Sequence, residues 1–188
     1  SALFPIILNI LHVAFVWYNY SLGERINLYY IKFNGSVWMT ADGTILTLPI
    51  DEFTVGVKIF DSAGAWCWAT DIRAIDENNV LIVFNYAGTT IKFARWNGTA
   101  WSITDVAAVD DPFDCAAIVV DNDSSYRIYV VKNISSRGGE IWEYITTDYG
   151  ATWTETKRIA GERADSLKSV YKCSPDCELL FSGGDGGS

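Results

Sequence analysis

The stretch TTDYGATW, Thr146 to Trp153, decides the fold because its residues specify one tight hairpin. Asp148 can accept backbone N–H bonds across the turn, and Gly150 can adopt a positive φ. Trp153 can pack beneath the loop, where its large apolar ring is covered. The stretch therefore predicts a β-hairpin whose final indole lies against a sheet. An ordinary D-x-G hairpin followed by a core Trp would use the same residues.

The chain repeats a unit that consists of an apolar strand, an aromatic strand and a turn ending in Trp. The paired strands of the three nearly complete copies are Leu11–Tyr18 with Asn27–Phe33, Val80–Phe84 with Thr90–Trp96, and Tyr126–Val131 with Ile141–Thr146. The first two turns contain Asn-Gly, which is favoured in tight hairpins because both residues tolerate positive φ. Trp38, Trp101 and Trp153 are therefore expected to occupy equivalent places, each between neighbouring sheets.

A further apolar strand is expected in the inner position of each unit, over Trp68–Ile75, Ala116–Val120 and Leu167–Tyr171. Four-stranded units of about 40 to 50 residues are typical of β-propeller blades. We expect an all-β propeller segment of three to four blades that forms a single domain over 1–188. The expected blades are blade 1 at about 1–60, blade 2 at about 61–108, blade 3 at about 109–160 and a partial blade 4 at about 161–188.

So few blades leave the ring incomplete. Either the chain is a fragment of a longer protein, or a homo-oligomer completes the open sheets with another copy, since unpaired apolar edge strands invite pairing.

Composition limits the partners of the chain. The formal net charge is −9, and no basic run is present to displace counterions from a phosphate backbone, so binding to nucleic acid is not expected. The segment Ala2–Tyr18 is apolar but carries Pro5, Asn9 and His12, and two buried strands explain it better than a helix inserted in a membrane. The 8 Trp, 10 Tyr and 9 Phe favour a β-rich protein.

Cysteines and sequons indicate the compartment. Cys173 and Cys177 bracket a turn-like Ser-Pro-Asp and form a candidate disulfide, whereas no C-x-x-C pair suggests zinc. N-x-S/T sequons predict an extracellular or secreted glycoprotein, although an Asn- and Thr-rich β-protein also makes sequons by accident. The candidate glycosylation sites are Asn19, Asn34, Asn97, Asn122 and Asn133.

Two segments carry a resemblance to a known family. The run Thr146–Trp153 fits the Asp-box pattern S/T-x-D-x-G-x-T/S-W, with Thr146, Asp148, Gly150, Thr152 and Trp153 in the specified places. The stretch INLYYIKFNGSVWMTADGTILTLPI, Ile26 to Ile50, is similar to a paired-strand segment of the same group. The chain thus resembles the sialidase-type, BNR-repeat β-propellers, a group that includes ulvan-type polysaccharide lyases. The resemblance implies an architecture and not an activity.

In such propellers the rim opposite the Asp-box turns is the functional one, as the resemblance implies. It is formed by the loops between second and third strands and between blades. Aromatic rings there can stack on sugars, and Arg can hold a carboxylate with two hydrogen bonds. The ligand-binding candidates are Tyr18, Tyr20, Arg25, Trp66, Trp68, Asp111, Arg137 and Glu140.

Catalytic residues are harder to assign. The resemblance implies three convergent Arg for a sialidase, and Arg25, Arg137 and Arg163 are weak candidates whose spacing matches no family motif. Solvated loop arginines explain them better. A lyase needs a base, for which His12 and Tyr30 are weak candidates. His12 alternates with apolar neighbours on a strand, which favours a structural role over a catalytic one.

No metal or other cofactor is expected, although Asp121–Ser125 superficially resembles a calcium loop. Tyr126 and Lys132 stand where such a loop needs Gly and Glu, so a polar turn is favoured.

Together these features favour a secreted segment that recognises a polysaccharide or other glycan through aromatic and Arg side chains. One alternative is part of a polysaccharide lyase or glycosidase whose catalytic residues lie partly elsewhere. The other is a structural subunit that self-assembles through its open sheets.

Overall fold

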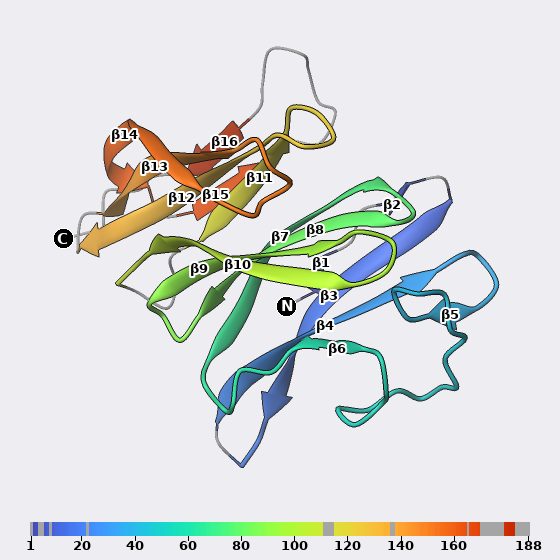
Figure 1. The fold of residues 1–188 in the computed structure, drawn as a ribbon. Helices are drawn as coiled ribbons and strands as arrows, with labels where there is room; N and C mark the ends of the chain where they lie inside the picture. The colour runs from blue at the N-terminus through green and yellow to red at the C-terminus, as the bar shows by residue number, and fades with distance from the viewer. Residues whose placement is uncertain are drawn as a thin grey trace.

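The computed structural model describes residues 2–3, 6–7, 9–21, 23–110, 115–135, 138–164, 166–169 and 179–182. Every element in these ranges is a β-strand, and neighbouring strands pair antiparallel (Figure 1). The prediction of an all-β fold is confirmed. No helix in the described ranges is long and apolar enough to cross a membrane.

The first sheet contains six strands rather than the four expected for a blade. Its inner position is divided between two short strands that both pair with β3, and its outer position between two that both pair with β4. The strands are β1 (Ala2–Leu3), β2 (Ile6–Ile7), β3 (Ile10–Asn19), β4 (Glu24–Phe33), β5 (Trp38–Met39) and β6 (Lys58–Phe60). The segment 40–57 causes the outer division, because it leaves the sheet after β5 and returns at β6.

The second and third sheets each have four strands in the order of the chain, and a two-stranded sheet follows. The second sheet contains β7 (Cys67–Asp76), β8 (Asn79–Tyr86), β9 (Thr90–Trp96) and β10 (Trp101–Ala108). The third contains β11 (Ala116–Val120), β12 (Tyr126–Ser135), β13 (Gly138–Thr146) and β14 (Thr154–Ala164). The last pair is β15 (Ser166–Ser169) with β16 (Leu179–Ser182).

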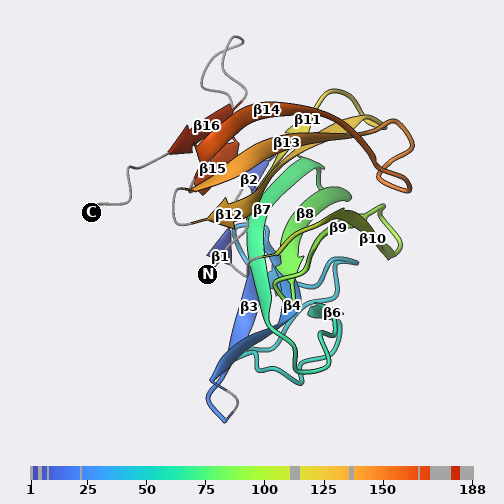
Figure 2. The ribbon, with the colours of Figure 1, turned by 90° about the vertical axis from the view of Figure 1, so that its left-hand side faces the viewer.

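The sheets are arranged radially, with their first strands side by side. Strand β7 contacts β1 and β2 of the first sheet and β11 of the third, and β11 contacts β15. Figures 1 and 2 show the sheets following one another around these inner strands. Meandering antiparallel sheets in this arrangement are those of a β-propeller, and the ring that the described strands make is not closed.

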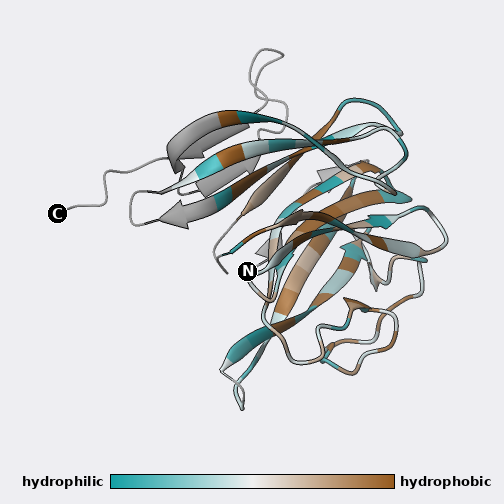
Figure 3. Cartoon of the chain, turned by 60° about the vertical axis from the view of Figure 1, so that its left-hand side comes forward, coloured by the Kyte–Doolittle hydropathy of each residue, from teal (hydrophilic) through white to brown (hydrophobic). Residues whose placement is uncertain are grey.

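The core lies between consecutive sheets because the middle strands have neighbours on both faces. In β8, the residues from Val80 to Asn85 are all buried, whereas a strand with one solvated face would alternate. Figure 3 shows this apolar centre, and it also shows polar residues along the end of the β3–β4 hairpin.

The turn indoles lie in related places. Trp101 packs on Tyr30 of the first sheet with ring centroids 5.2 Å apart, and Trp153 packs on Phe93 of the second at 5.1 Å. Each therefore reaches from its own sheet to the preceding one. Trp38 packs on Phe33 with ring centroids 4.9 Å apart, and its apolar cluster is made only of the first sheet and segment 40–57. In the described ranges, no second sheet covers Trp38.

Segment 40–57 covers part of this outer face. Leu46 and Ile50 pack against the first sheet, and Val57 is fully buried. The same segment leaves four large apolar side chains exposed to solvent, namely Ile45, Leu48, Phe53 and Val55. The first sheet thus ends the described array with an apolar surface.

Candidate functional site

Three loops meet on the rim opposite the Trp turns, between the first and second sheets. They are the β3–β4 hairpin, the crossover 61–66 from β6 to β7, and the β8–β9 hairpin. Each strand of the first hairpin is ten residues long. Figures 1 and 3 show the hairpin projecting past its neighbours.

Five of the predicted binding residues come together here. The indoles of Trp66 and Trp68 are stacked, with centroids 5.7 Å apart and an interplanar angle of 16°. The Arg25 guanidinium lies over the Trp68 ring, 4.5 Å from its centroid. Tyr18, the cross-strand neighbour of Arg25, packs edge-on against Tyr20 at 4.9 Å. Tyr20 is 89% exposed, so the rim presents aromatic surface to solvent.

Arg25 keeps its hydrogen-bonding capacity. Within the described ranges, no carboxylate forms an ion pair with its guanidinium. A guanidinium stacked on an aromatic face still directs its N–H donors outward in the plane of the group. The site can therefore offer an aromatic platform and a planar set of donors together.

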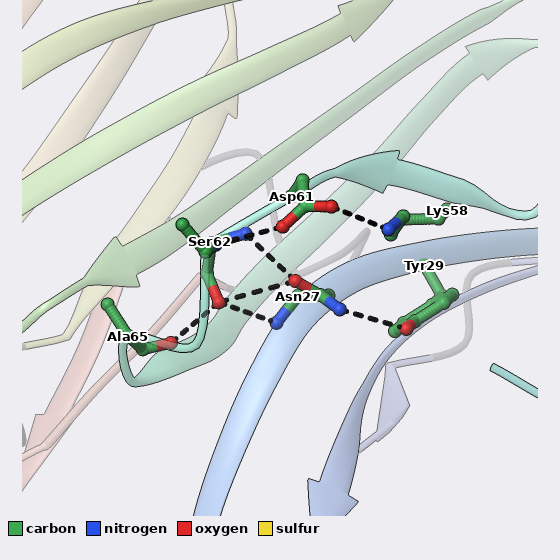
Figure 4. A network of polar contacts seen from close by, with 7 residues as sticks. Asn27, Tyr29, Lys58, Asp61, Ser62 and Ala65 are labelled. Carbon is green, nitrogen blue, oxygen red and sulfur yellow. Dashed lines mark hydrogen bonds and ion pairs between the residues drawn. The ribbon is translucent and has the colours of Figure 1, made fainter.

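A buried polar contact fastens the crossover to β4 (Figure 4). The Ser62 backbone N–H donates to Asn27 Oδ1 at 2.8 Å, and the Asn27 backbone N–H donates to Ser62 Oγ at 3.1 Å. At the outer end of the crossover, Lys58 pairs with Asp61 at 2.6 Å, and this hydrogen bond lowers the pKa of the Asp61 carboxyl. Sequence reasoning missed these residues, although an Asn inside an apolar strand signals a special backbone position.

Trp66 joins three chain segments through its backbone. It forms an antiparallel bridge with Ile26, and its carbonyl accepts the Ala87 N–H at 2.8 Å. The β8–β9 hairpin therefore belongs to the rim, and sequence reasoning missed it. This hairpin joins the second and third strands of its sheet, and the rule that such loops form one rim therefore predicts its place as well.

The missed hairpin adds further aromatic and charged groups. Tyr86 packs edge-on against Phe60 of β6 at 5.2 Å. The Lys92 ammonium lies 5.3 Å from the Tyr86 ring centroid and pairs with Asp105. The aromatic surface thus continues from the first sheet onto the second.

Of the remaining rim candidates, only Glu140 has a described side chain, and it lies apart from this cluster. Glu140 lies on β13 of the third sheet, where it pairs with Arg158 at 2.8 Å and accepts the Trp142 indole N–H at 2.9 Å. Arg163 belongs to β14, and its side chain lies outside the described part of the chain. Asp111, Arg137, Cys173 and Cys177 also lie outside it.

His12 and Tyr30 are buried between the first and second sheets. Both side chains have almost no exposed surface, and His12 Nδ1 lies 2.6 Å from the Tyr30 hydroxyl. Burial lowers the pKa of His12 to about 4, with the Lys32 ammonium adding to the effect. A substrate on the rim does not meet either group in this arrangement.

The Thr146–Trp153 turn lies at the opposite end of the sheets and is held by its own side chains. Asp148 Oδ1 accepts the Thr152 N–H at 3.0 Å, and the Thr146 hydroxyl donates to the same oxygen at 2.6 Å. Hydrogen bonds from Thr146 and Thr152 lower the pKa of Asp148 to about 2. Gly150 has φ +85°. These groups shape a turn and present no reacting centre.

The acidic turn at Asp121 uses its oxygens internally. Asn122 Oδ1 accepts the N–H groups of Ser124 and Ser125, both at 3.0 Å, and Asp121 pairs with Arg127. In the ranges that the structure describes, no three His, Cys, Asp or Glu side chains gather closely enough to hold one metal ion.

Comparison with known proteins supports the architecture. No protein-family model matches the chain, and no curated protein matches it in sequence. A polysaccharide lyase, Ulvanlyase, solved both free and bound to GlcA(1-4)Rha3S, matches 98% of the chain with a TM-score of 0.81 at 16% identity. The six-bladed β-propeller lectin of Aleuria aurantia matches 97% of the chain with a TM-score of 0.56 at 11% identity. SapL1 lectin in complex with alpha methyl fucoside matches 100% of the chain with a TM-score of 0.54 at 16% identity.

The chain spans about half the length of these proteins: 49% of the lyase, 55% of the Aleuria aurantia lectin and 60% of SapL1. At such identities the likeness concerns the fold alone. The chain has the fold of a β-propeller segment.

Proposed function

We propose that the rim between the first and second sheets binds a glycan outside the cell. The observation that carries this proposal is the gathering of Trp66, Trp68, Arg25, Tyr18 and Tyr20 on one exposed edge. Stacked indoles offer an apolar face that matches the C–H face of a sugar ring, and exposed tyrosines extend that face. The neighbours in fold support the same class of ligand, because they include a lyase for a polysaccharide and lectins that bind fucose.

Arg25 gives the proposed site a preference for particular sugars. Its guanidinium can donate two parallel hydrogen bonds to a carboxylate or sulfate, or single bonds to ring hydroxyls. Ulvan carries both kinds of anion in the unit bound to the lyase, whereas fucosides and fructans are neutral ligands. Comparing the retention by ulvan, a fucosylated oligosaccharide and a fructan therefore distinguishes recognition of an anion by Arg25 from recognition of hydroxyl groups.

Affinity gel electrophoresis with these three glycans tests the proposal. We expect at least one to retard the protein, and we expect Tyr20→Ala and Trp66→Ala to weaken that retention about tenfold, a change of about 1.4 kcal/mol in binding free energy. Tyr149→Ala is the matched control, since Tyr149 is also exposed and also carries a guanidinium, that of Arg95, but lies on the opposite rim. No retention by any of the three glycans, or equal loss in the control, would contradict the proposal.

Secretion and glycosylation belong to the same proposal. Asn34, Asn97 and Asn122 are exposed at turns, where a transferred glycan would extend into solvent. Expression in a eukaryotic secretory host should give a mass that falls on treatment with an amidase that removes N-glycans. An unchanged mass would remove this support for an extracellular location.

As a second candidate function, the chain forms part of a polysaccharide lyase or glycosidase. The observation behind this candidate is that the fold matches the lyase with a TM-score of 0.81, against 0.56 for the Aleuria aurantia lectin. Lyase action on a uronate polymer creates an unsaturated, ultraviolet-absorbing product. We expect that absorbance when further blades complete the ring, and its absence with a complete ring would reject the lyase.

A further inference from the structure

The contact between Asn27 and Ser62 lies at an irregular point of the first sheet. Strand β4 has one more residue than β3 between the pairs Trp17–Ile26 and Phe15–Tyr29, which makes a bulge. Asn27 occupies the bulge with φ +59°, a left-handed conformation that Asn tolerates better than most residues. The bulge turns the Asn27 side chain and backbone N–H toward the crossover, as Figure 4 shows.

Ser62 is fully buried, and Asn27 is 7% exposed. The two residues exchange backbone and side-chain hydrogen bonds in both directions, and the Asn27 Nδ2–H group donates to the Tyr29 hydroxyl at 3.1 Å. Because buried polar groups are costly to leave without partners, this exchange fixes one distance between β4 and the crossover.

The same serine fixes the path that leads to Trp66. The Ser62 hydroxyl donates to the Ala65 carbonyl at 2.6 Å, and the Ala65 N–H donates to the Ser62 carbonyl at 2.9 Å. Ala65 directly precedes Trp66, whose backbone then bridges to Ile26. A chain of hydrogen bonds thus runs from the β4 bulge to the first indole of the stacked pair.

We propose that Asn27 and Ser62 are positioning residues that hold the crossover so that the Trp66 indole stacks on Trp68. The positioning role itself is independent of the ligand. Only its expected effect, that loss of this contact weakens glycan binding, rests on the proposed function. Neither residue touches the ligand in this account. They act by selecting one path of loop 61–66, and hence one orientation of the aromatic platform, before the glycan arrives.

Variants can separate this role from general support of the sheet. Asn27→Gly keeps the left-handed backbone and removes the side chain, whereas Ser62→Ala removes the hydroxyl bonded to Asn27 and Ala65. Asn27→Asp is the conservative rescue, because it keeps an oxygen that accepts the Ser62 N–H. Tyr29→Phe is the matched control, because it removes a bond to Asn27 on the side away from the crossover.

The first measurement is the exciton couplet that two stacked indoles give in the circular dichroism spectrum, assigned by its loss in Trp66→Phe. It is recorded at a temperature where thermal unfolding curves show all variants folded. We expect Asn27→Gly and Ser62→Ala to lose most of the couplet, while Asn27→Asp and Tyr29→Phe retain it. An intact couplet in both Asn27→Gly and Ser62→Ala, or an equal loss in Tyr29→Phe, would overturn the proposal.

The second measurement is the dissociation constant for whichever of the three glycans the wild-type protein retains. We expect it to rise about tenfold in Asn27→Gly and Ser62→Ala and to change less than about twofold in the other two variants. Loss of the couplet with unchanged affinity would overturn the consequence for binding. If the wild type retains no glycan, the proposed function fails, and the couplet alone decides whether Asn27 and Ser62 position Trp66.

Discussion

Asp148 and Gly150 show how single residues shape the turns that separate the sheets. Asp148 accepts bonds from both arms of its turn, and Gly150 brings the turn backbone against the second sheet. The Thr104 hydroxyl of β10 donates to the Gly150 carbonyl at 2.7 Å and accepts the Trp153 indole N–H at 3.2 Å. The turn is therefore bonded both within itself and to its neighbour.

Replacing Gly150 by Ala should destabilise the fold strongly. A Cβ at this position would lie 2.2 Å from Phe93 Cε1, and the φ of +85° is itself strained for Ala. We expect the free energy of unfolding to fall by about 2 to 5 kcal/mol, from strain and overpacking together. Gly35→Ala is the control, since Gly35 has φ +92° with nothing within 4 Å, and we expect it to lose about 1 kcal/mol. Urea unfolding that gave equal losses would show that Gly150 does not approach Phe93.

His12 should make the fold sensitive to mild acid. Its pKa is about 4 in the folded chain against 6.5 for an exposed histidine, so between these values the unfolded chain binds a proton that the folded chain does not. Stability should therefore fall as the pH drops from 6.5 toward 4, by up to roughly 3 kcal/mol. The depressed pKa values of Asp148 and Glu155 act mainly below this window. His12→Asn should flatten the dependence of the melting temperature on pH between 6.5 and 4.5, and an unchanged slope would assign it to other groups.

At the scale of the elements, the turn indoles determine how firmly one sheet holds the next. Trp101 and Trp153 each pack on an aromatic side chain of the preceding sheet, whereas Trp38 packs within the first sheet and against segment 40–57. Replacing Trp101 or Trp153 by Ala should cost about 3 to 5 kcal/mol of unfolding free energy, because the contact between two sheets is lost with the indole. Trp38→Ala should cost less, roughly 1 to 2 kcal/mol, because Trp38 packs only within the first sheet and against segment 40–57. Equal losses at all three positions in urea unfolding would contradict the radial packing.

The elements were largely predictable from the sequence because each signal was local. Alternating apolar residues and Asn-Gly or Asp-x-Gly turns placed the paired strands of three sheets, and Ala116–Val120 is found as the strand predicted there. The division of the outer strand into β5 and β6 was not predictable, because residues 40–57 contain turn and apolar residues without a strand period. The contact between Asn27 and Ser62 was missed because the two residues lie 35 positions apart in the sequence.

In the whole molecule, topology predicts on which rim the aromatic residues lie, whereas their packing against one another is known only from the structure. The rule that loops between second and third strands and loops between blades share a rim assigned Tyr18, Arg25, Trp66 and Trp68 to one edge, where the structure has them in contact. The order of their stacking depends on side-chain packing that no local pattern encodes. The same rule also places the β8–β9 hairpin on this rim, but the hydrogen bond from the Ala87 N–H to the Trp66 carbonyl is known only from the structure.

The radial array also leaves apolar side chains at its first face. Phe53 is 81% exposed and Val55 is 89% exposed, on the segment that covers the first sheet. Contiguous exposed apolar surface is typical of regions that contact another surface. Self-assembly through this face stays a prediction.

Protection of tryptophans from oxidation can show which rim binds a glycan, because the 8 Trp of the chain include residues on both rims. The protein is treated briefly with N-bromosuccinimide, with and without the glycan that retards it in affinity gels, and oxidation at each Trp is measured by peptide mass spectrometry. We expect the glycan to slow oxidation of Trp66 and Trp68 and to leave oxidation of Trp38 and Trp153, at the opposite rim, unchanged. Protection of Trp38 or Trp153 without protection of the Trp66–Trp68 pair would contradict this expectation.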